Sequence, residues 1–337
     1  MIDLTTNYLG LTLDNPLVPS ASPMSKNIDH VRQLEDAGAA AIVMYSLFEE
    51  DLREEEEHMI KFGIEGGIGH HEAEHYLPVH HEVTTTLERY LEHLTKMKSA
   101  VDIPVIASLN GTSMNHWLDH GKDLQDAGAD ALELNIYYIA ANINETAEMV
   151  EARYQGIVSE LTQHVNIPVT VKLSPQFSAL PNFVDQLEQA GARGVSLFNR
   201  FYQPDINLDD LSVDYHLTLS NPGDSLLRMR WIALLYGRVK LSLAATGGIH
   251  SASEALKVIA AGANVAHLCS TLLTHGPKQL GRIKSDMEAW LEEHEYESIK
   301  QITGSISQQH APDPASYERA NYSKTLNTFK LSTTNWH

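Results

Sequence analysis

Cysteine, basic residues and long apolar runs are all scarce in this sequence of 337 residues. The single cysteine, Cys269, excludes a framework of intrachain disulfides and a cysteine-ligated iron–sulfur cluster. The chain has 24 Lys and Arg residues against 44 Asp and Glu residues, and its net charge of −20 argues against a nucleic-acid or anionic-membrane partner. No stretch approaches the ~20 apolar residues of a membrane span, and the N-terminus does not resemble a signal peptide. These absences predict an acidic cytoplasmic protein.

One short phrase recurs four times along the chain. The copies are Asp36-Ala-Gly-Ala, Asp126-Ala-Gly-Ala, Gln189-Ala-Gly-Ala and Ala260-Ala-Gly-Ala, and each is followed by an apolar run. Ala-Gly is a typical helix end, because glycine adopts the left-handed cap conformation. A continuous apolar run after it is typical of a strand that is buried on both faces of a parallel sheet. Each copy therefore predicts a helix that leads into a buried strand.

Eight such strands alternate with eight helices in the predicted pattern. The strands are expected at 17–20, 41–45, 105–109, 131–136, 169–173, 194–199, 241–245 and 265–270. The helices are expected at 28–37, 84–99, 115–127, 146–165, 180–190, 225–236, 252–261 and 277–293. Eight βα units in one chain of this length predict an α/β fold of the (β/α)8 TIM barrel type. A doubly wound open sheet is the alternative that the sequence leaves open.

Two long inserts interrupt this pattern, and a polar tail follows it. Residues 48–83 come after the second strand and residues 202–223 after the sixth, so both inserts should lie at the carboxyl rim, where barrel enzymes bind substrates. The acidic run 49–57 in the first insert predicts a solvated helix face. We predict a single domain at 1–305 and a polar C-terminal tail at 306–337.

A glycine pair and a hydroxyl pair follow the last two predicted strands. Gly247 and Gly248 follow the seventh strand, and Ser270 and Thr271 end the eighth. Glycines let the backbone approach a ligand closely, and a helix N-terminus favours negative charge. Because the loops after strands 7 and 8 of TIM barrels often hold a phosphate, this stretch predicts a phosphate site, with a plain βαβ turn as the alternative.

Three polar side chains lie at the ends of other apolar strands. Lys172 ends the fifth strand, Asn135 the fourth and Asn199 the sixth. Amides supply both donors and acceptors and suit the edge of a planar heterocycle. Each residue alone could reach solvent or cap a loop, but three together favour a site at the rim.

The first insert contains a histidine-rich stretch. His71-Glu-Ala-Glu-His75 matches the H-E-x-x-H pattern, in which two imidazoles one helical turn apart hold zinc. Gly66, Gly67, Gly69 and Pro78 flank the motif and are a poor context for such a helix. A polar histidine-rich loop near a pocket mouth is therefore the preferred interpretation, and no metal is expected.

From about Asn7 to about Ser305, the sequence resembles the dihydroorotate dehydrogenase family, whose members are FMN-dependent TIM barrels. The motifs are the opening Asn7-Tyr-Leu-Gly-Leu-Thr-Leu-Asp-Asn-Pro-Leu, Glu133-Leu-Asn, Val171-Lys-Leu-Ser-Pro, Ala245-Thr-Gly-Gly-Ile and Cys269-Ser-Thr-Leu-Leu. The last two are the most specific, because in the family they bind the FMN phosphate.

The resemblance implies a set of site residues. The FMN-binding positions would be Ala21, Ser22, Ser46, Lys172, Asn199, Thr246, Gly247, Gly248, Ser270 and Thr271. The amides that hold the substrate in the family match Asn135 and Asn199, and Tyr45 would lie beside them. The resemblance also implies a small pyrimidine-like substrate, a soluble electron acceptor and a homodimer.

The positions that bind the substrate in the family carry different residues in this sequence. Met44-Tyr-Ser replaces the Thr-Lys-Ser at the end of strand 2, so Tyr45 stands where the family has a lysine. Tyr138 stands at the position of the catalytic Cys or Ser base, and the His-rich insert replaces an Asn-rich substrate loop. A phenol is a weak base near neutral pH but can donate a proton.

These departures leave two main hypotheses. The first is an FMN-dependent oxidoreductase, in which Lys172 stabilises negative charge on the reduced flavin and Tyr138 donates or accepts a proton. The second is a flavin-binding protein that has lost activity on dihydroorotate or acts on a different substrate. A zinc hydrolase using His71 and His75 is a distant third hypothesis.

Overall fold

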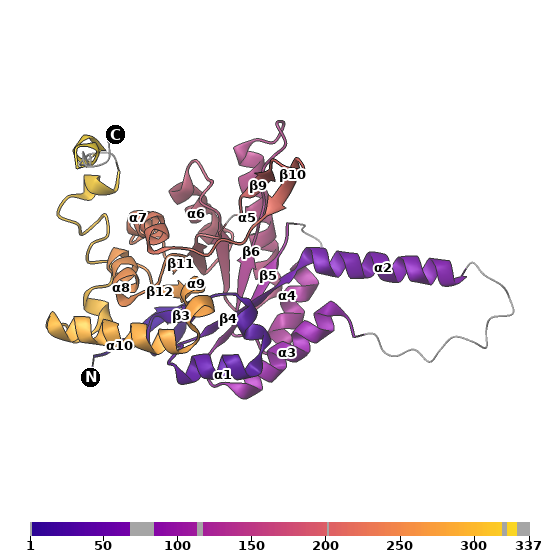
Figure 1. The fold of residues 1–337 in the computed structure, drawn as a ribbon, viewed down its shortest axis with the longest axis horizontal. Coiled ribbons are helices and arrows are strands. Elements are labelled where there is room, and N and C mark those ends of the chain that lie inside the picture. Colours follow the sequence, from indigo (N-terminus) through magenta and orange to yellow (C-terminus); the bar gives the residue numbers. More distant parts are fainter. Residues whose placement is uncertain (1, 68–83, 113–116, 201, 319–321, 329–337) are drawn as a thin grey trace.

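A barrel of eight parallel strands forms the centre of the molecule, which is described here by a computed structural model (Figure 1). The described residues are 2–67, 84–112, 117–200, 202–318 and 322–328. The strand order is β3-β12-β11-β8-β7-β6-β5-β4, and each neighbouring pair runs parallel. The Ala40 amide, just before β4, donates to the Leu17 carbonyl of β3 at 3.1 Å and brings the two ends of the sheet together. The fold is therefore the predicted (β/α)8 TIM barrel, and the open sheet is excluded.

All eight predicted barrel strands are present: β7 has the predicted bounds, and no end of the other strands differs from its predicted position by more than three residues. They are β3 (Leu17–Pro19), β4 (Ile42–Phe48), β5 (Val105–Asn110), β6 (Ala131–Asn135), β7 (Val169–Leu173), β8 (Gly194–Leu197), β11 (Ser242–Thr246) and β12 (Val265–Leu268).

The helices that cover the barrel also follow the predicted pattern. They are α1 (Ile28–Asp36), α3 (Thr86–Ala100), α4 (Trp117–Asp126), α5 (Ala147–His164), α6 (Leu180–Gln189), α7 (Ser225–Leu235), α8 (Ala252–Ala261) and α10 (Lys278–Glu293). The four Ala-Gly phrases end α1, α4, α6 and α8, and their glycines all have positive φ, between 94° and 123°. The left-handed caps predicted from the sequence are thus confirmed.

The core consists of an outer and an inner apolar layer. The outer layer packs strand residues such as Met44, Leu132 and Val171 against the helices. The inner layer is small and includes Val18, Val43 and Ile106. Since neighbouring side chains of a strand point to opposite faces, this alternation places Glu133, Lys172 and other polar residues inside the barrel.

Two antiparallel hairpins flank the barrel, and neither was predicted from the sequence. The first pairs β1 (Thr6–Tyr8) with β2 (Leu11–Leu13), and Tyr8 and Leu13 join the inner apolar layer. The second pairs β9 (Pro204–Asn207) with β10 (Ser212–Tyr215) within the second predicted insert. Each strand has only three or four residues, which is too short for periodicity to reveal.

The first insert begins with α2 (Glu49–Gly67), a helix that extends away from the barrel (Figure 1). Glu50, Asp51, Glu54, Glu56 and Glu57 are exposed, so the acidic run is a solvated helix face as predicted. Among the described residues, no helix has the length and apolar character needed to cross a membrane.

Short helices complete the chain. They are η1 (Pro23–Lys26), η2 (Pro222–Asp224), α9 (Ser270–His275), η3 (Ile299–Gln301), η4 (Pro314–Tyr317) and α11 (Tyr322–Leu326). Part of the predicted tail packs on the barrel helices, because the Ile306 amide donates to Ala260 and the Gln308 amide to Ala233. A domain boundary at 305 stays a prediction.

Candidate functional site

A cavity of about 1100 Å³ lies at the carboxyl ends of the barrel strands. Residues of the β9–β10 hairpin and of the first turn of α2 also line it. Five of the residues singled out in the sequence line this one cavity: Ala21, Ser46, Asn135, Lys172 and Asn199. They come from five different strands or strand ends, so the closed barrel gathers groups that lie far apart in the sequence.

Lys172 lies at the floor of the cavity, where its ammonium group pairs with a buried carboxylate. Its Nζ donates to Glu133 Oε1 at 3.3 Å, and Ser196 Oγ donates to Glu133 Oε2 at 3.2 Å. Strand register explains this arrangement, since β7 pairs Lys172 with Ser196 and β6 pairs Glu133 with Thr170. Glu133 was not singled out from the sequence, although a carboxylate between two leucines of a buried strand was a visible signal.

The two predicted amides meet at the neighbouring rim position. Asn199 Nδ2 donates to Asn135 Oδ1 at 2.7 Å, and the Asn199 backbone amide donates to the Leu173 carbonyl at 2.7 Å. Asn135 is buried, while Asn199 is partly exposed. The pair presents amide groups to the cavity that can bind the edge of a planar polar ring.

A β-bulge in β4 decides which residues of the second strand reach the cavity. The register with β5 shifts between Val43 and Ser46. Ser46 lines the cavity and lies within hydrogen-bond distance of Ser108, with Oγ atoms 2.9 Å apart. Tyr45 packs on the helical side instead, where its ring contacts Tyr90 edge-on with centroids 5.0 Å apart. Tyr45 is therefore not among the cavity-lining residues.

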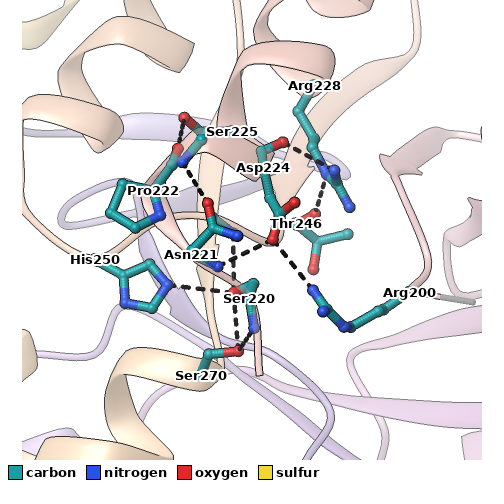
Figure 2. Close-up of polar contacts among 12 residues, drawn as sticks. Arg200, Ser220, Asn221, Pro222, Asp224, Ser225, Arg228, Thr246, His250 and Ser270 are labelled. Carbon is teal, nitrogen blue, oxygen red and sulfur yellow. Dashed lines mark hydrogen bonds and ion pairs between the residues drawn. The ribbon is translucent and has the colours of Figure 1, made fainter. Parts of the chain in front are cut away.

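The residues that follow β11 and β12 meet the loop around Ser220 in a compact polar cluster, in which Ser220, His250 and Ser270 lie close together (Figure 2). Gly247 and Gly248 have φ values of +96° and +83°, which favour glycine. A Cβ on Gly248 would lie 2.2 Å from the Ser225 backbone nitrogen, so the backbone passes too close for any side chain. Thr271 Oγ1 is buried and has no hydrogen-bond partner among the described residues. A close-packed glycine backbone beside an unpaired buried hydroxyl fits a phosphate group.

The cluster also contains residues that were not identified from the sequence. Ser220 Oγ accepts from the Gly248 amide at 3.2 Å and donates to Ser270 Oγ at 2.8 Å (Figure 2). His250 Nε2 lies 3.3 Å from the same Ser220 oxygen. Arg228 Nε donates to the Thr246 carbonyl at 3.0 Å and so fixes the turn that leads into the glycines. The polar loop 220–225 gave no apolar period that could have located these contacts.

Ser22 and Tyr138 lie near the rim but do not line the cavity. Ser22 occupies the N-cap position of η1 without a side-chain capping hydrogen bond, and its carbonyl accepts from Ser25 Oγ at 3.0 Å. The Tyr138 hydroxyl donates to Glu145 Oε2 at 2.5 Å, and the Arg153 guanidinium lies over the tyrosine ring, 4.1 Å from its centre. The neighbouring Tyr137 is the tyrosine of this run that lines the cavity.

The remaining questions at the candidate site are metal binding, which the sequence analysis considered for His71 and His75, and the reactivity of the Cys269 thiol. His71 and His75 lie outside the described residues, and the described part of the chain has no group of three or more His, Cys, Asp or Glu residues that could hold a metal. Burial raises the pKa of the Cys269 thiol, which opposes formation of a thiolate. The Cys269 thiol is therefore a poor nucleophile in this environment.

An eight-stranded barrel with polar groups gathered at the strand ends has the architecture of a TIM-barrel enzyme. Comparison with protein families finds a match to the dihydroorotate dehydrogenase family over residues 79–291, more than half of the chain. The protein belongs to the dihydroorotate dehydrogenase family and is a dihydroorotate dehydrogenase-like oxidoreductase.

Several curated proteins are similar to this chain over most of its length. The catalytic subunit of dihydroorotate dehydrogenase B (NAD(+)) from Thermoplasma acidophilum is 23% identical over 310 residues, which cover 90% of this chain and 99% of the relative. The corresponding subunit from Caldicellulosiruptor bescii is 26% identical over 228 residues, covering 66% and 74%. Dihydroorotate dehydrogenase A (fumarate) from Lactobacillus delbrueckii subsp. bulgaricus is 26% identical over 226 residues, covering 64% and 72%.

Proposed function

We propose that the protein is an FMN-dependent oxidoreductase that moves a hydride between the flavin and a small pyrimidine-like substrate. The observation that carries this proposal is the cavity in which Lys172, Asn135 and Asn199 meet, with a cradle that fits phosphate on two neighbouring strands. When bound, FMN would supply the hydride-accepting ring, and the protein would supply orientation and electrostatics.

The phosphate half of the proposal rests on the cluster between β11 and β12. Gly247 and Gly248 would offer backbone N–H groups, and Ser270 and Thr271 would offer hydroxyls, beside Thr246 at the end of β11. The flavin ring would lie against Ala21, Ser46, Lys172 and Asn199, which line the cavity, while contact with Ser22 stays a prediction from the sequence. The Lys172 ammonium would stabilise negative charge on the reduced ring.

The proton that accompanies the hydride needs a donor or acceptor near the cavity. Tyr138 holds this role in the sequence-based hypothesis, and that role stays a prediction. The hydroxyl of Tyr138 is hydrogen-bonded to Glu145, whereas Tyr137 lines the cavity. Its position at the cavity wall makes Tyr137 a second candidate for the residue that donates or accepts this proton.

The cavity charge supports a substrate that differs from the dihydroorotate anion. Among the described lining residues, Lys172 pairs with Glu133, and Arg200 pairs with Asp224 at 3.2 Å. Glu50 and Asp51 add carboxylates at the rim, and the second-strand position of the family's lysine is Tyr45. Carboxylates that face a binding cavity disfavour an anionic ligand. A second candidate function is therefore flavin-dependent turnover of a neutral ring compound.

Anaerobic reduction of the flavin in the purified protein tests both candidate functions, turnover of dihydroorotate and turnover of a neutral ring compound. We expect FMN to co-purify and its absorbance to bleach when the protein is mixed with a reduced pyrimidine. Dihydroorotate and its neutral analogue 5,6-dihydrouracil are compared at equal concentration. Faster bleaching by dihydrouracil supports the changed substrate, whereas faster bleaching by dihydroorotate contradicts it. A protein that neither contains nor binds FMN contradicts the proposed function as a whole.

The electron acceptor and the assembly state are further parts of the proposal. We propose a soluble acceptor, in line with the acceptors named for the relatives, NAD(+) and fumarate. We also propose a homodimer, because the β9–β10 hairpin exposes the apolar side chains of Ile206, Leu208, Leu211, Val213 and Tyr215. Light scattering after size-exclusion chromatography measures the mass, and a monomer at all concentrations contradicts the dimer.

A further inference from the structure

The interior of the barrel holds an ionic pair where TIM barrels usually pack branched apolar side chains. Glu133 is fully buried, and Lys172 has 7% of its surface exposed, toward the cavity. Burying a carboxylate costs several kcal/mol unless a partner compensates the charge. Among the described residues, the Lys172 ammonium compensates the buried charge of Glu133, with Lys172 Nζ 3.3 Å from Glu133 Oε1.

The other polar groups around Glu133 carry no compensating charge. Ser196 donates a neutral hydrogen bond to the second carboxylate oxygen. His267 on β12 is buried, and burial lowers the pKa of its imidazole to about 4, so this ring is neutral at neutral pH. The Tyr8 hydroxyl and the Thr170 hydroxyl are buried without hydrogen-bond partners among the described residues. Lys172 and Glu133 therefore form an isolated pair of opposite charges beneath the cavity floor.

We propose that Glu133 is a positioning residue: it holds the Lys172 ammonium at the cavity floor, and its buried negative charge sets how strongly that ammonium favours the reduced flavin. This proposal rests on the proposed function, because it concerns the way residue 133 acts on bound FMN through Lys172. Two opposite charges in contact cancel much of each other's field at a third site. The pair consequently presents a weaker positive field to the cavity than a free ammonium would.

The expected consequence is a flavin whose reduction potential depends on residue 133. In Glu133→Gln the buried negative charge is lost, but the side chain can still contact Ser196 and Lys172. The unbalanced Lys172 ammonium then stabilises the anionic reduced flavin. We expect the ratio of reduced to oxidised FMN, equilibrated against a reference dye, to rise by about tenfold or more.

The experiment compares this ratio in the FMN-loaded wild type and in a set of variants. Thr170→Val is the matched control, because it removes a buried hydroxyl from the same layer of the barrel without changing charge. Ser196→Ala removes the neutral hydrogen bond to Glu133. Both should change the ratio by less than about twofold. Lys172→Met and the double variant Lys172→Met/Glu133→Gln complete a double-mutant cycle.

The cycle separates action through Lys172 from direct action. If Glu133 acts through Lys172, Glu133→Gln has little effect in the Lys172→Met background. Equal effects in both backgrounds, or an unchanged ratio in Glu133→Gln, overturn the proposal while leaving FMN binding intact. Absence of FMN binding by the wild type overturns the proposed function and this inference together.

A second variant covers the case in which Glu133→Gln does not fold. Glu133→Asp keeps the charge but shortens the side chain by one methylene, which weakens the hold on Lys172. We expect FMN affinity, measured by quenching of flavin fluorescence, to fall about tenfold in Glu133→Asp and not to fall further when Lys172→Met is added. Undiminished affinity in Glu133→Asp contradicts the positioning role.

Discussion

Asn199 donates its side-chain amide to the side-chain oxygen of Asn135 at 2.7 Å and thereby ties the ends of β8 and β6 together. The two residues are 64 positions apart in the sequence. Each amide fixes the orientation of the other, because a donor and an acceptor satisfy one another at the cavity surface. A pair held in this way presents a fixed pattern of polar groups to a bound ring.

Removing this amide should weaken ligand binding more than folding. We expect Asn199→Ala to lower the free energy of unfolding by about 1 kcal/mol and the affinity for FMN by about tenfold. The matched control is Asn182→Ala, which removes the Asn182–Gln186 hydrogen bond on the exposed face of α6. Fluorescence titration and urea unfolding measure the two effects. An FMN affinity equal to that of Asn182→Ala contradicts a binding role for Asn199.

Gly248→Ala should disrupt the proposed phosphate cradle. The new Cβ would lie 2.2 Å from the Ser225 backbone nitrogen, and alanine is strained at φ +83°. We expect a loss of about 2–4 kcal/mol in the free energy of unfolding, the sum of backbone strain and overpacking. FMN affinity should also fall at least about tenfold.

Gly10→Ala separates backbone strain from cradle geometry. Gly10 has a similar φ of +82°, but a Cβ added there would meet no atom within 4 Å. This variant should lose about 1 kcal/mol of stability and keep its FMN affinity. Equal FMN affinity in Gly10→Ala and Gly248→Ala, measured by titration, contradicts the proposed site.

The buried imidazole of His267 should make stability fall in acid. Its pKa is lowered from 6.5 to about 4 by burial, so the unfolded chain binds this proton more readily than the folded chain. The stabilising contribution is complete above the unfolded pKa and is lost as pH falls from about 6.5 to about 4. Between about pH 7 and about pH 4.5, this one group should remove about 2 kcal/mol of stability.

Substitution of His267 isolates its share of the acid sensitivity. Urea unfolding at the two pH values should give a smaller acid loss for His267→Gln than for the wild type. His30→Gln is the control, because His30 lies exposed on α1. If His267→Gln loses as much stability between about pH 7 and about pH 4.5 as His30→Gln does, His267 is not the source of the acid sensitivity.

Tyr137 and Tyr138 should differ in their effects on the reaction. Tyr137 lines the cavity, so Tyr137→Phe should slow substrate-dependent flavin reduction by about 100-fold, because the group that accepts the proton released by the reduced substrate is lost. Tyr138→Phe should slow it less than about tenfold and lower stability by about 2 kcal/mol, because its hydroxyl binds the Glu145 carboxylate. Stopped-flow absorbance gives the rates. The reverse order of effects supports Tyr138 as the proton acceptor.

The sequence by itself determined the barrel and the glycine turn. Each buried strand is predicted by an Ala-Gly helix end or by an apolar run in the sequence next to it. These patterns are local, so they can be recognised without knowing which residues pack together in the fold. The Gly247–Gly248 turn was found for the same reason, since only glycine tolerates its backbone conformation and close packing. Strand identity and the site's position at the carboxyl rim therefore followed from short-range patterns.

The tertiary structure alone decided which side chains face one another. The bulge between Val43 and Ser46 reverses the alternation of β4, so Ser46 rather than Tyr45 lines the cavity. The Lys172–Glu133 contact joins residues 39 positions apart and depends on the register of two paired strands. A shift of one residue moves every side chain of a strand to the opposite face, and strand composition does not reveal such a shift. The order of residues thus specified the barrel, while register and packing specified the chemistry at its rim.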